Sequence, residues 1–281
     1  MIGNINKTKM LLDRFDLRAK KGFGQNFLVD ENILSKIASE ASLDKETGVI
    51  EIGPGLGALT EHLLINSKKV LAYEIDSDMV EVLNYSLKEY DNLLIKNIDF
   101  LKANLEEDIK YFDDCKCIKV VANLPYYITT AIITKLLEAN VGIEDYFFMV
   151  QKEVGDRLTS EPRTKDYGSL TVLMKYKAIT KVCFKVGKNC FYPAPEVDSA
   201  IINVKPHKID LGVNNEDEFV KFIYAIFSQR RKTLVNNISS ALKISKDAIK
   251  KNLLSLGLSD SARAEELDLN KIVQLYKQFY Q

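Results

Sequence analysis

The chain has 281 residues, of which 46% are hydrophobic and 28% are charged. Its 39 lysines and arginines balance its 39 aspartates and glutamates, so bulk charge gives no argument for a polyanionic partner. The longest uncharged run, Val120–Thr134, is too short to span a membrane, and the amino terminus lacks the apolar stretch of a signal peptide.

The cysteines and histidines indicate the cellular compartment and limit which metal sites and catalytic groups the chain can have. The cysteines, at positions 115, 117, 183 and 190, show no C-x-x-C spacing, and His62 and His207 lie far apart in the sequence. This spacing argues against a zinc site and favours reduced thiols in a cytoplasm. The scarcity of histidine also argues against acid–base catalysis by an imidazole. We expect a cytoplasmic protein that binds no metal.

The first 29 residues form a basic segment that ends in a glycine-containing loop. Residues 7–21 carry six lysines and arginines against Asp13 and Asp16. The following stretch, residues 22–28, holds two glycines and two aromatic residues, which predicts an ordered loop that lies against another part of the chain. The basic residues fit either RNA contacts or a solvated, mobile tail, and the sequence leaves both open.

Residues 30–208 alternate between short apolar strands and amphipathic helices. Strands are expected at Gly48–Ile52, Lys69–Ile75, Leu93–Ile98, Ile118–Ala122 and Tyr146–Val150, and helices at Ala58–Asn66, Ser77–Tyr90, Leu105–Phe112, Thr129–Ala139 and Lys152–Ser160. This alternation predicts a parallel sheet with helices on both faces. Two further runs, Lys181–Val186 and Ser199–Val204, are expected to form an antiparallel pair at the edge of the sheet.

From about Glu216 onward only helices are expected. Their ranges are Phe219–Gln229, Leu234–Leu242, Lys246–Leu256 and Asn270–Tyr280. We therefore divide the chain into a basic amino-terminal segment (1–29), an α/β domain (30–208) and a helical C-terminal domain (209–281).

Four polar positions follow successive strands. Gly53 opens a glycine-rich loop after the first strand, and Glu74, Asp99 and Asn123 end the next three strands. Because the carboxyl ends of parallel strands meet at one edge of a sheet, we expect these residues to lie close together. The loop and Glu74 suit either a dinucleotide or S-adenosylmethionine. Asp99 favours the latter, because it suits the adenine amino group and nicotinamide enzymes have no standing need for it.

The run Asn123-Leu124-Pro125-Tyr126 is polar and aromatic at the end of a buried strand. An amide and a ring placed there suit the binding of a flat, neutral, polar group. The alternative is that this run has no binding role and is only a turn between a strand and a helix, which Pro125 marks. We expect the next residue, Tyr127, to serve packing.

Together these motifs resemble a known family. Gly53-x-Gly55, Glu74, Asp99 and Asn-Leu-Pro-Tyr look like an S-adenosylmethionine-dependent methyltransferase that acts on an exocyclic amine. Four further motifs narrow the resemblance to the ribosomal RNA adenine dimethyltransferases of the KsgA type: Gly24–Leu28, Gln151–Val154, Tyr167–Leu170 and Phe191–Ser199. Ala131 and Ala194 replace prolines that are frequent in the family, and neither change removes a functional group.

The resemblance implies a Rossmann-like methyltransferase domain with a small all-helical C-terminal domain. It also implies methyl transfer from S-adenosylmethionine to two adjacent adenosines near the 3′ end of small-subunit (16S) rRNA, during ribosome biogenesis. The implied partner is small-subunit rRNA or the 30S particle, with no membrane involved, and the implied protein is a cytoplasmic monomer that uses no metal.

The resemblance further implies the roles of individual residues. Asn26 and Leu28 would cover the cofactor, Gly53 would contact its amino-acid end, Glu74 its ribose and Asp99 its adenine. The full cofactor set is Asn26, Leu28, Gly53, Gly55, Glu74, Asp99 and Asn123. The catalytic set is Asn123, Leu124, Tyr126 and Phe191, in which the amide and the Leu124 carbonyl accept the target amine and the two rings stack on the adenine.

Three alternatives stay open at this point. The first is a 23S rRNA adenine methyltransferase, although Gly24 before Gln-Asn-Phe-Leu and the long helical tail favour the small-subunit type. The second is a nicotinamide oxidoreductase, which leaves the run Asn123–Tyr126 unexplained. The third is a largely non-catalytic ribosome assembly factor on the same fold.

Overall fold

The computed structural model describes residues 1–20, 22, 24–139, 141–207 and 210–280. The chain forms two compact units. One comprises Met1–Gly155 and Lys181–Pro206, and the other comprises Asp156–Thr180 and His207–Gln281. The helical unit thus includes residues 156–180, which the division made from the sequence assigns to the α/β domain. Lys21 and the expected boundary at residues 208 and 209 lie outside the described residues.

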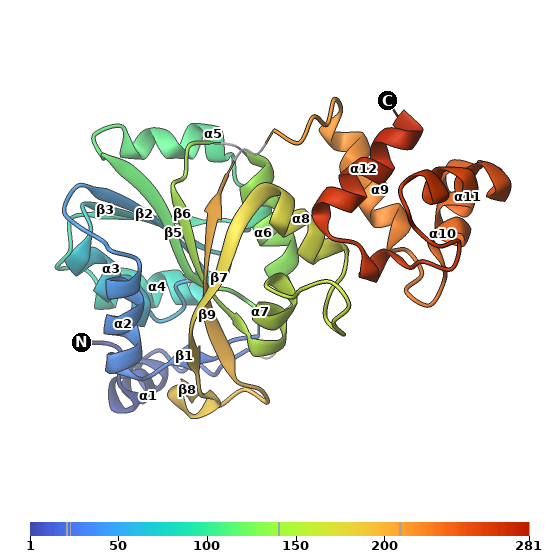
Figure 1. Ribbon diagram of the computed structural model, residues 1–281. Coiled ribbons are helices and arrows are strands. Elements are labelled where there is room, and N and C mark those ends of the chain that lie inside the picture. Colours follow the sequence, from blue (N-terminus) through green and yellow to red (C-terminus); the bar gives the residue numbers. More distant parts are fainter. Residues whose placement is uncertain (21, 23, 140, 208–209, 281) are drawn as a thin grey trace. The chain divides into compact units, whose positions relative to one another are not determined.

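A seven-stranded sheet forms the centre of the first unit (Figure 1). Its strand order is β4 (Leu93–Asn97), β3 (Lys69–Glu74), β2 (Thr47–Ile52), β5 (Cys117–Asn123), β6 (Asp145–Gln151), β9 (Ser199–Pro206) and β7 (Ala178–Val186). The first five strands run parallel, and β9 runs antiparallel to β6. The predicted α/β fold, with two added strands at one edge, is confirmed.

Helices cover both faces of this sheet because its strands are apolar on both sides; all six residues of β2 are buried. On one face lie α2 (Glu31–Glu40), α3 (Ala58–Asn66) and α4 (Ser77–Ser86), and on the other lie α5 (Leu105–Asp108) and α6 (Thr129–Ala139) (Figure 1). One core cluster joins helix and strand side chains, among them Leu34, Leu63, Leu83, Val49, Val70 and Val121. This packing fixes the strand ends on which the functional residues lie.

The amino-terminal segment contains a helix that the sequence pattern did not predict, α1 (Ile5–Arg14). The Asn4 side chain caps it by accepting a hydrogen bond from Lys7 N at 2.9 Å. Leu11 and Leu12 are buried in the core cluster of the sheet, and Ile2 N donates to a Glu61 carboxylate oxygen at 2.6 Å. The segment is therefore docked, and the alternative of a mobile tail is wrong.

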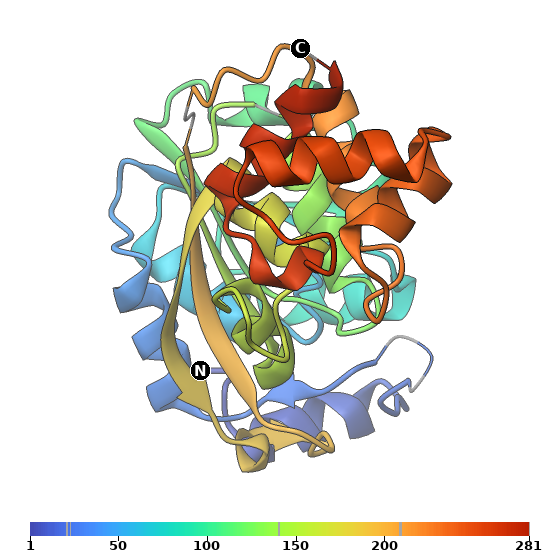
Figure 2. The same cartoon turned by 45° about the vertical axis from the view of Figure 1, so that its right-hand side comes forward.

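A second, two-stranded sheet lies beside α1 (Figure 2). In it β1 (Phe27–Leu28) pairs antiparallel with β8 (Phe191–Tyr192). The loop that ends the basic segment is thereby joined to a stretch more than 160 residues further along the chain.

The second unit consists mainly of helices around one apolar core. They are α8 (Ser169–Lys177), α9 (Glu216–Ile226), α10 (Leu234–Leu242), α11 (Lys246–Ser255) and α12 (Leu269–Tyr280), while α7 (Lys152–Leu158) follows β6 directly. Phe219, Phe222 and Tyr276 pack edge to face at the centre of this core. The four predicted C-terminal helices are confirmed. Among the described residues, no helix combines the length and the apolar character that crossing a membrane requires.

Candidate active site

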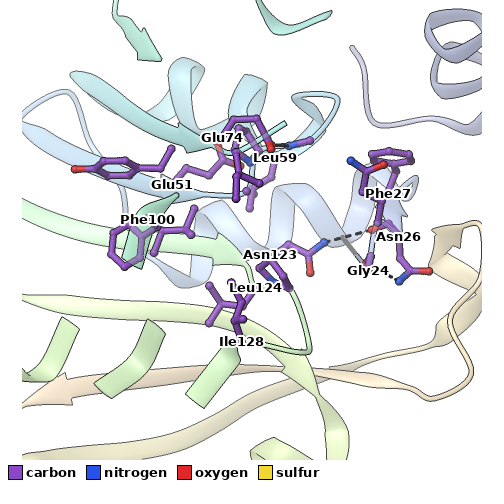
Figure 3. A pocket seen from close by; sticks show the side chains of 18 of the residues that line it. Gly24, Asn26, Phe27, Glu51, Leu59, Glu74, Phe100, Asn123, Leu124 and Ile128 are labelled. Carbon is purple, nitrogen blue, oxygen red and sulfur yellow. Dashed lines mark hydrogen bonds between the residues drawn. The ribbon is translucent and has the colours of Figure 1, made fainter. Parts of the chain in front are cut away.

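A cavity of about 360 Å³ opens at the carboxyl ends of β2, β3 and β5 (Figure 3). The loop after β2, the ends of β3 and β5, the turn after β4 and residues 24–28 line it. Nine of the ten predicted site residues lie in its wall: Asn26, Leu28, Gly53, Gly55, Glu74, Asp99, Asn123, Leu124 and Tyr126. The expectation that the carboxyl ends of parallel strands meet at one edge of the sheet, called the strand-end rule below, brought together four separate parts of the sequence. The resemblance added the fifth part, which contains Asn26 and Leu28.

The glycine-rich loop follows a backbone path that favours glycine. Gly53 and Gly55 have φ angles of 70° and 56°, in the left-handed region. A Cβ at Gly55 would lie 3.2 Å from the Phe27 ring, so a side chain there would also push away the segment that covers the cavity. This segment, called the covering segment below, comprises Lys20 and residues 24–28. The loop leads directly into α3, whose amino-terminal end carries a partial positive charge.

Glu74 is held in place by the backbone on both sides. Its Oε1 accepts a hydrogen bond from Asp76 N at 2.8 Å, and its Oε2 accepts one from Gly55 N at 3.1 Å. Burial raises the pKa of this carboxyl group, and the two N–H donors oppose that shift. Because a carboxylate oxygen has two lone pairs, each oxygen can still accept one more hydrogen bond.

Asp99, in the turn after β4, is anchored in a similar way. Strand β4 lies beside β3, which ends in Glu74, on the side away from β2. Its Oδ1 accepts a hydrogen bond from Leu101 N at 2.9 Å, which caps the short turn Phe100–Lys102. Phe100 is buried behind it and also lines the cavity. The carboxylate is thus fixed at the cavity wall with acceptor capacity left over.

The turn after β5 is rigid. Leu124 N donates to Met149 O at 3.1 Å, and Pro125 O accepts from Ile128 N and from Thr129 Oγ1. The Asn123 side-chain nitrogen points to Asn26 O at 3.5 Å (Figure 3). Within the part of the chain that the structure describes, nothing donates to Asn123 Oδ1 or to the Leu124 carbonyl oxygen. Two acceptors are therefore available side by side.

Two neighbouring tyrosines extend this turn. The hydroxyl of Tyr126 hydrogen-bonds with Ser199 Oγ at 2.7 Å, which fixes the ring in the cavity wall. Tyr127 was expected to pack, and this expectation is wrong: it is 57% exposed and lines the cavity. Its ring approaches Gly24 of the covering segment.

The cavity wall carries acidic side chains and, in its described lining, no basic ones. Three carboxyl groups line it, those of Glu51, Glu74 and Asp99, and its described lining contains no lysine, arginine or histidine. Such a wall suits a cationic small molecule and repels a pyrophosphate. S-adenosylmethionine fits this pattern because it carries a sulfonium and an ammonium, whereas a nicotinamide dinucleotide does not fit it.

Comparison with known proteins decides the family. The family model of ribosomal RNA adenine dimethylases matches residues 16–281. The chain belongs to this family.

Individual relatives agree with the family. The chain is 42% identical to the ribosomal RNA small subunit methyltransferase A of Staphylococcus aureus strain JH9, over 99% of this chain and 95% of the relative. A solved dimethyladenosine transferase from Plasmodium falciparum has a TM-score of 0.72 at 28% identity, covering 88% of this chain and 94% of that one. The 23S rRNA methyltransferase ErmE has a TM-score of 0.67 at 27% identity, covering 91% and 100%.

One residue expected in the site of this dimethylase lies elsewhere. Phe191 is 4% exposed and belongs to the core cluster of the sheet, where its backbone pairs with Leu28. It is absent from the described lining of the cavity. Its stacking on a target adenine stays a prediction.

Sequence reasoning missed two groups of this dimethylase's site. Glu51 is the one charged residue in strand β2, and that contrast was a usable signal. The second group is a set of hydrogen bonds between the covering segment and α4, for which the sequence pattern gave no signal. Lys20 Nζ lies 2.8 Å from Asp76 Oδ1 and 2.7 Å from Asp78 Oδ2, and Gln25 Nε2 donates to Asp76 Oδ2 at 3.0 Å.

Proposed function

We propose that this dimethylase transfers methyl groups from S-adenosylmethionine to the exocyclic amines of two adjacent adenosines near the 3′ end of 16S rRNA. The observation that carries the proposal is that the acceptor pair of Asn123 and Leu124 lines the same cavity as Glu74 and Asp99. The relative that is 42% identical over nearly the whole chain is named a small-subunit rRNA methyltransferase.

The cofactor would be held by residues already fixed in the cavity wall. Glu74 would accept hydrogen bonds from the ribose hydroxyls, and Asp99 would accept one from the adenine amino group. Gly53 and Gly55 would let the amino-acid end approach the backbone, while Asn26 and Leu28 cover the cavity. When bound, S-adenosylmethionine supplies an electrophilic methyl group on its sulfonium.

Asn123 and Leu124 would prepare the target amine. The lone pair of an adenine amine is delocalised into the ring, so the amine is a weak nucleophile. Hydrogen bonds from the amine to Asn123 Oδ1 and to the Leu124 carbonyl localise that lone pair and stabilise the positive charge that develops during transfer. The proton then leaves through these oxygens to solvent, so no strong base is needed. A singly methylated amine keeps one proton and a lone pair, which permits a second transfer.

Tyr126 would stack on the target adenine, which must leave its helical stack to enter the cavity. Its hydrogen bond to Ser199 holds the ring in a fixed plane for that contact. Stacking by Phe191 on the other face would require its ring to leave the core cluster, so the proposal rests mainly on Tyr126.

The finer assignments belong to the same proposal. The partner would be small-subunit rRNA or the 30S particle, the protein would act as a monomer in the cytoplasm, and it would use no metal. The sheet unit would carry the methyltransferase chemistry, and the helical unit would be a separate C-terminal domain. A second candidate substrate is 23S rRNA, because the 23S rRNA methyltransferase ErmE shares the fold at 27% identity.

The test is transfer of labelled methyl to purified ribosomal subunits that lack the modification, followed by nucleoside analysis. We expect dimethyladenosine at two adjacent positions near the 3′ end of 16S rRNA, and no label on large subunits. Label confined to 23S rRNA would overturn the substrate and keep the chemistry. Cofactor binding without any transfer would support a non-catalytic assembly factor.

A further inference from the structure

The function proposed above gives no role to Tyr127, an aromatic side chain of the cavity wall. It is 57% exposed, and it lies in a turn that is closed by a hydrogen bond from Ile128 N to Pro125 O. Within the described part of the chain, its hydroxyl has no hydrogen-bond partner and its ring meets no other aromatic ring. The ring is therefore free to bury apolar area against a flat ligand in the cavity.

The two tyrosines of this turn reach toward opposite sides of β5. Tyr126 bonds with Ser199 in β9, which follows β6 on one side of β5. Burial raises the pKa of the Tyr127 hydroxyl, and the charges of Asp99 and Glu74 add to this shift. Because charge effects between exposed groups fade within about 10 Å in salt solution, this hydroxyl lies near the ends of β4 and β3, on the other side of β5. Tyr126 would thus face the target adenine, and Tyr127 the cofactor.

The Tyr127 ring also contacts the covering segment. Gly24 of that segment has a φ angle of 62°, and a Cβ built there would lie 3.7 Å from Tyr127 Cδ1. The glycine therefore lets the backbone of the segment pass close to the ring. Both residues line the cavity, Gly24 from the covering segment (Figure 3) and Tyr127 from the turn after β5. A ligand held between these two elements would meet the ring.

We propose that Tyr127 is a further cofactor-binding residue, whose ring packs against the adenosine half of S-adenosylmethionine beside Gly24. The inference rests on the proposed function, in which Glu74 binds the ribose and Asp99 the adenine amino group. A base stacks on an aromatic ring through its π-face, so the contact does not depend on the charge elsewhere in the ligand. Tyr127 therefore contributes equally to binding of the methyl donor and of its demethylated product.

Calorimetry on the full-length protein tests this contact through three ligands that share the adenosine half: S-adenosylmethionine, S-adenosylhomocysteine and 5′-methylthioadenosine. Tyr127→Ala should weaken binding of all three by the same factor, about 5- to 50-fold. Tyr127→Phe keeps the ring and should bind each ligand within about twofold of wild type. Because the side chain is exposed, both variants should melt within a few degrees of wild type, which shows that they are folded.

The chain contains no tryptophan, which permits a second, spectroscopic measurement. Tyr127→Trp places a single indole at this position. Its emission should shift to shorter wavelength and lose intensity when S-adenosylhomocysteine or 5′-methylthioadenosine binds, and methionine, which lacks the adenosine half, should change nothing. The matched control is Tyr224→Trp, at an exposed tyrosine of α9 in the helical unit, whose emission should respond to none of these ligands.

The outcomes separate this inference from the function on which it rests. Wild-type affinity in Tyr127→Ala, or unchanged emission of Tyr127→Trp while calorimetry shows binding, would overturn the role of Tyr127 and leave the proposed methyl transfer intact. Slower transfer by Tyr127→Ala at unchanged cofactor affinity would also overturn it, and would place the ring against the target nucleotide instead. Failure of the wild-type protein to bind S-adenosylmethionine at all would overturn both the inference and the proposed function.

Discussion

At the scale of single residues, acidic side chains gather in the wall of the cavity, and none of its described lining residues is basic. Glu51 and Glu74 come from adjacent strands and both are at most 5% exposed; burial raises the pKa of both carboxyl groups, and the charge of Glu74 adds to the shift at Glu51. Asp99 adds a third carboxylate at the same cavity. A cationic ligand relieves this repulsion, so binding and charge neutralisation are one event.

Glu74 and Tyr126 should affect different steps. Glu74→Ala removes the predicted acceptor for the ribose, and we expect cofactor affinity to fall about 10- to 100-fold. Tyr126→Ala removes a stacking face worth roughly 1–3 kcal/mol and should lower mainly the rate of transfer. Tyr126→Phe is the matched control, because it keeps the ring and loses only the hydrogen bond to Ser199. Calorimetry and single-turnover kinetics measure the two effects, and equal losses of cofactor binding in both alanine variants would contradict the assignment.

The pKa of Glu51 also predicts how stability depends on pH. Its value in the folded protein, about 8, lies above the ordinary value of 4.5. Between these values the folded protein holds a proton that the unfolded chain has released, so the free energy of unfolding falls as pH rises through this window. Glu51→Gln removes that dependence.

We therefore expect the melting temperature of Glu51→Gln, relative to wild type, to rise by a few degrees or more between about pH 5 and pH 8.5. Both proteins are scanned without cofactor, in matched buffers and at one heating rate. A difference between variant and wild type that is the same at both pH values would show that Glu51 does not titrate in this range.

At the scale of elements, the covering segment is held at both ends of its path across the cavity. Lys20 and Gln25 bind Asp76, which also caps α4, and Asp76 N donates to Glu74. At the other end the Asn26 carbonyl accepts from Asn123. The segment therefore contacts the predicted amine residue, Asn123, directly and is linked to the predicted ribose residue, Glu74, through Asp76.

Breaking the contact at Lys20 should loosen the cover. Lys20→Ala is expected to weaken cofactor binding by up to about fivefold, since Lys20 is partly exposed and such ion pairs contribute little more than 1 kcal/mol. The effect should shrink at high salt. Lys7→Ala, which removes an exposed lysine on α1, is the control. Wild-type affinity in Lys20→Ala at low salt would show that the cover does not depend on this contact.

Some elements were predictable and others were not, for physical reasons. Strands β2, β3 and β6 are buried on both faces, so their apolar runs made them recognisable, and the ranges of α3 and α6 agree with expectation. Helix α1 was not predicted because its stripe of buried residues is short and lies among lysines. The pairing of β1 with β8 joins two-residue strands that no periodicity could reveal. Likewise, the strand-end rule located the site, but it gave no information on where aromatic rings outside the main sheet point, as Phe191 in β8 and Tyr127 in the turn after β5 show.

At the scale of the whole molecule, the sequence order of the chain differs from its division into compact units. Residues 156–180 precede the last strand of the sheet, yet they belong to the helical unit, and Tyr167 and Val172 among them are buried in its core. Tyr167 shows this, because its hydroxyl donates to Leu267 O at 2.8 Å. A cut near the boundary expected from the sequence would therefore divide this core.

A chain truncated after Pro206 should consequently be unstable. It keeps Tyr167 and Val172 and removes the C-terminal helices that bury them. We expect it to bind a hydrophobic dye such as ANS and to melt at a lower temperature than the full chain. Tyr167→Phe in the full chain is the mild comparison, with an expected loss of about 1 kcal/mol. A truncated chain that is soluble, binds no dye and melts as the full protein does would contradict the division.

The most direct test of the central claim is single-turnover methyl transfer by Asn123→Ala to unmodified small subunits, at saturating S-adenosylmethionine. The claim is that the turn after β5 presents the amine to a cofactor held in the same cavity. It predicts a rate about 100-fold or more below wild type. Because Asn123 also belongs to the predicted cofactor set, saturation is confirmed by calorimetry before the rate is compared. Transfer at the wild-type rate would contradict the claim.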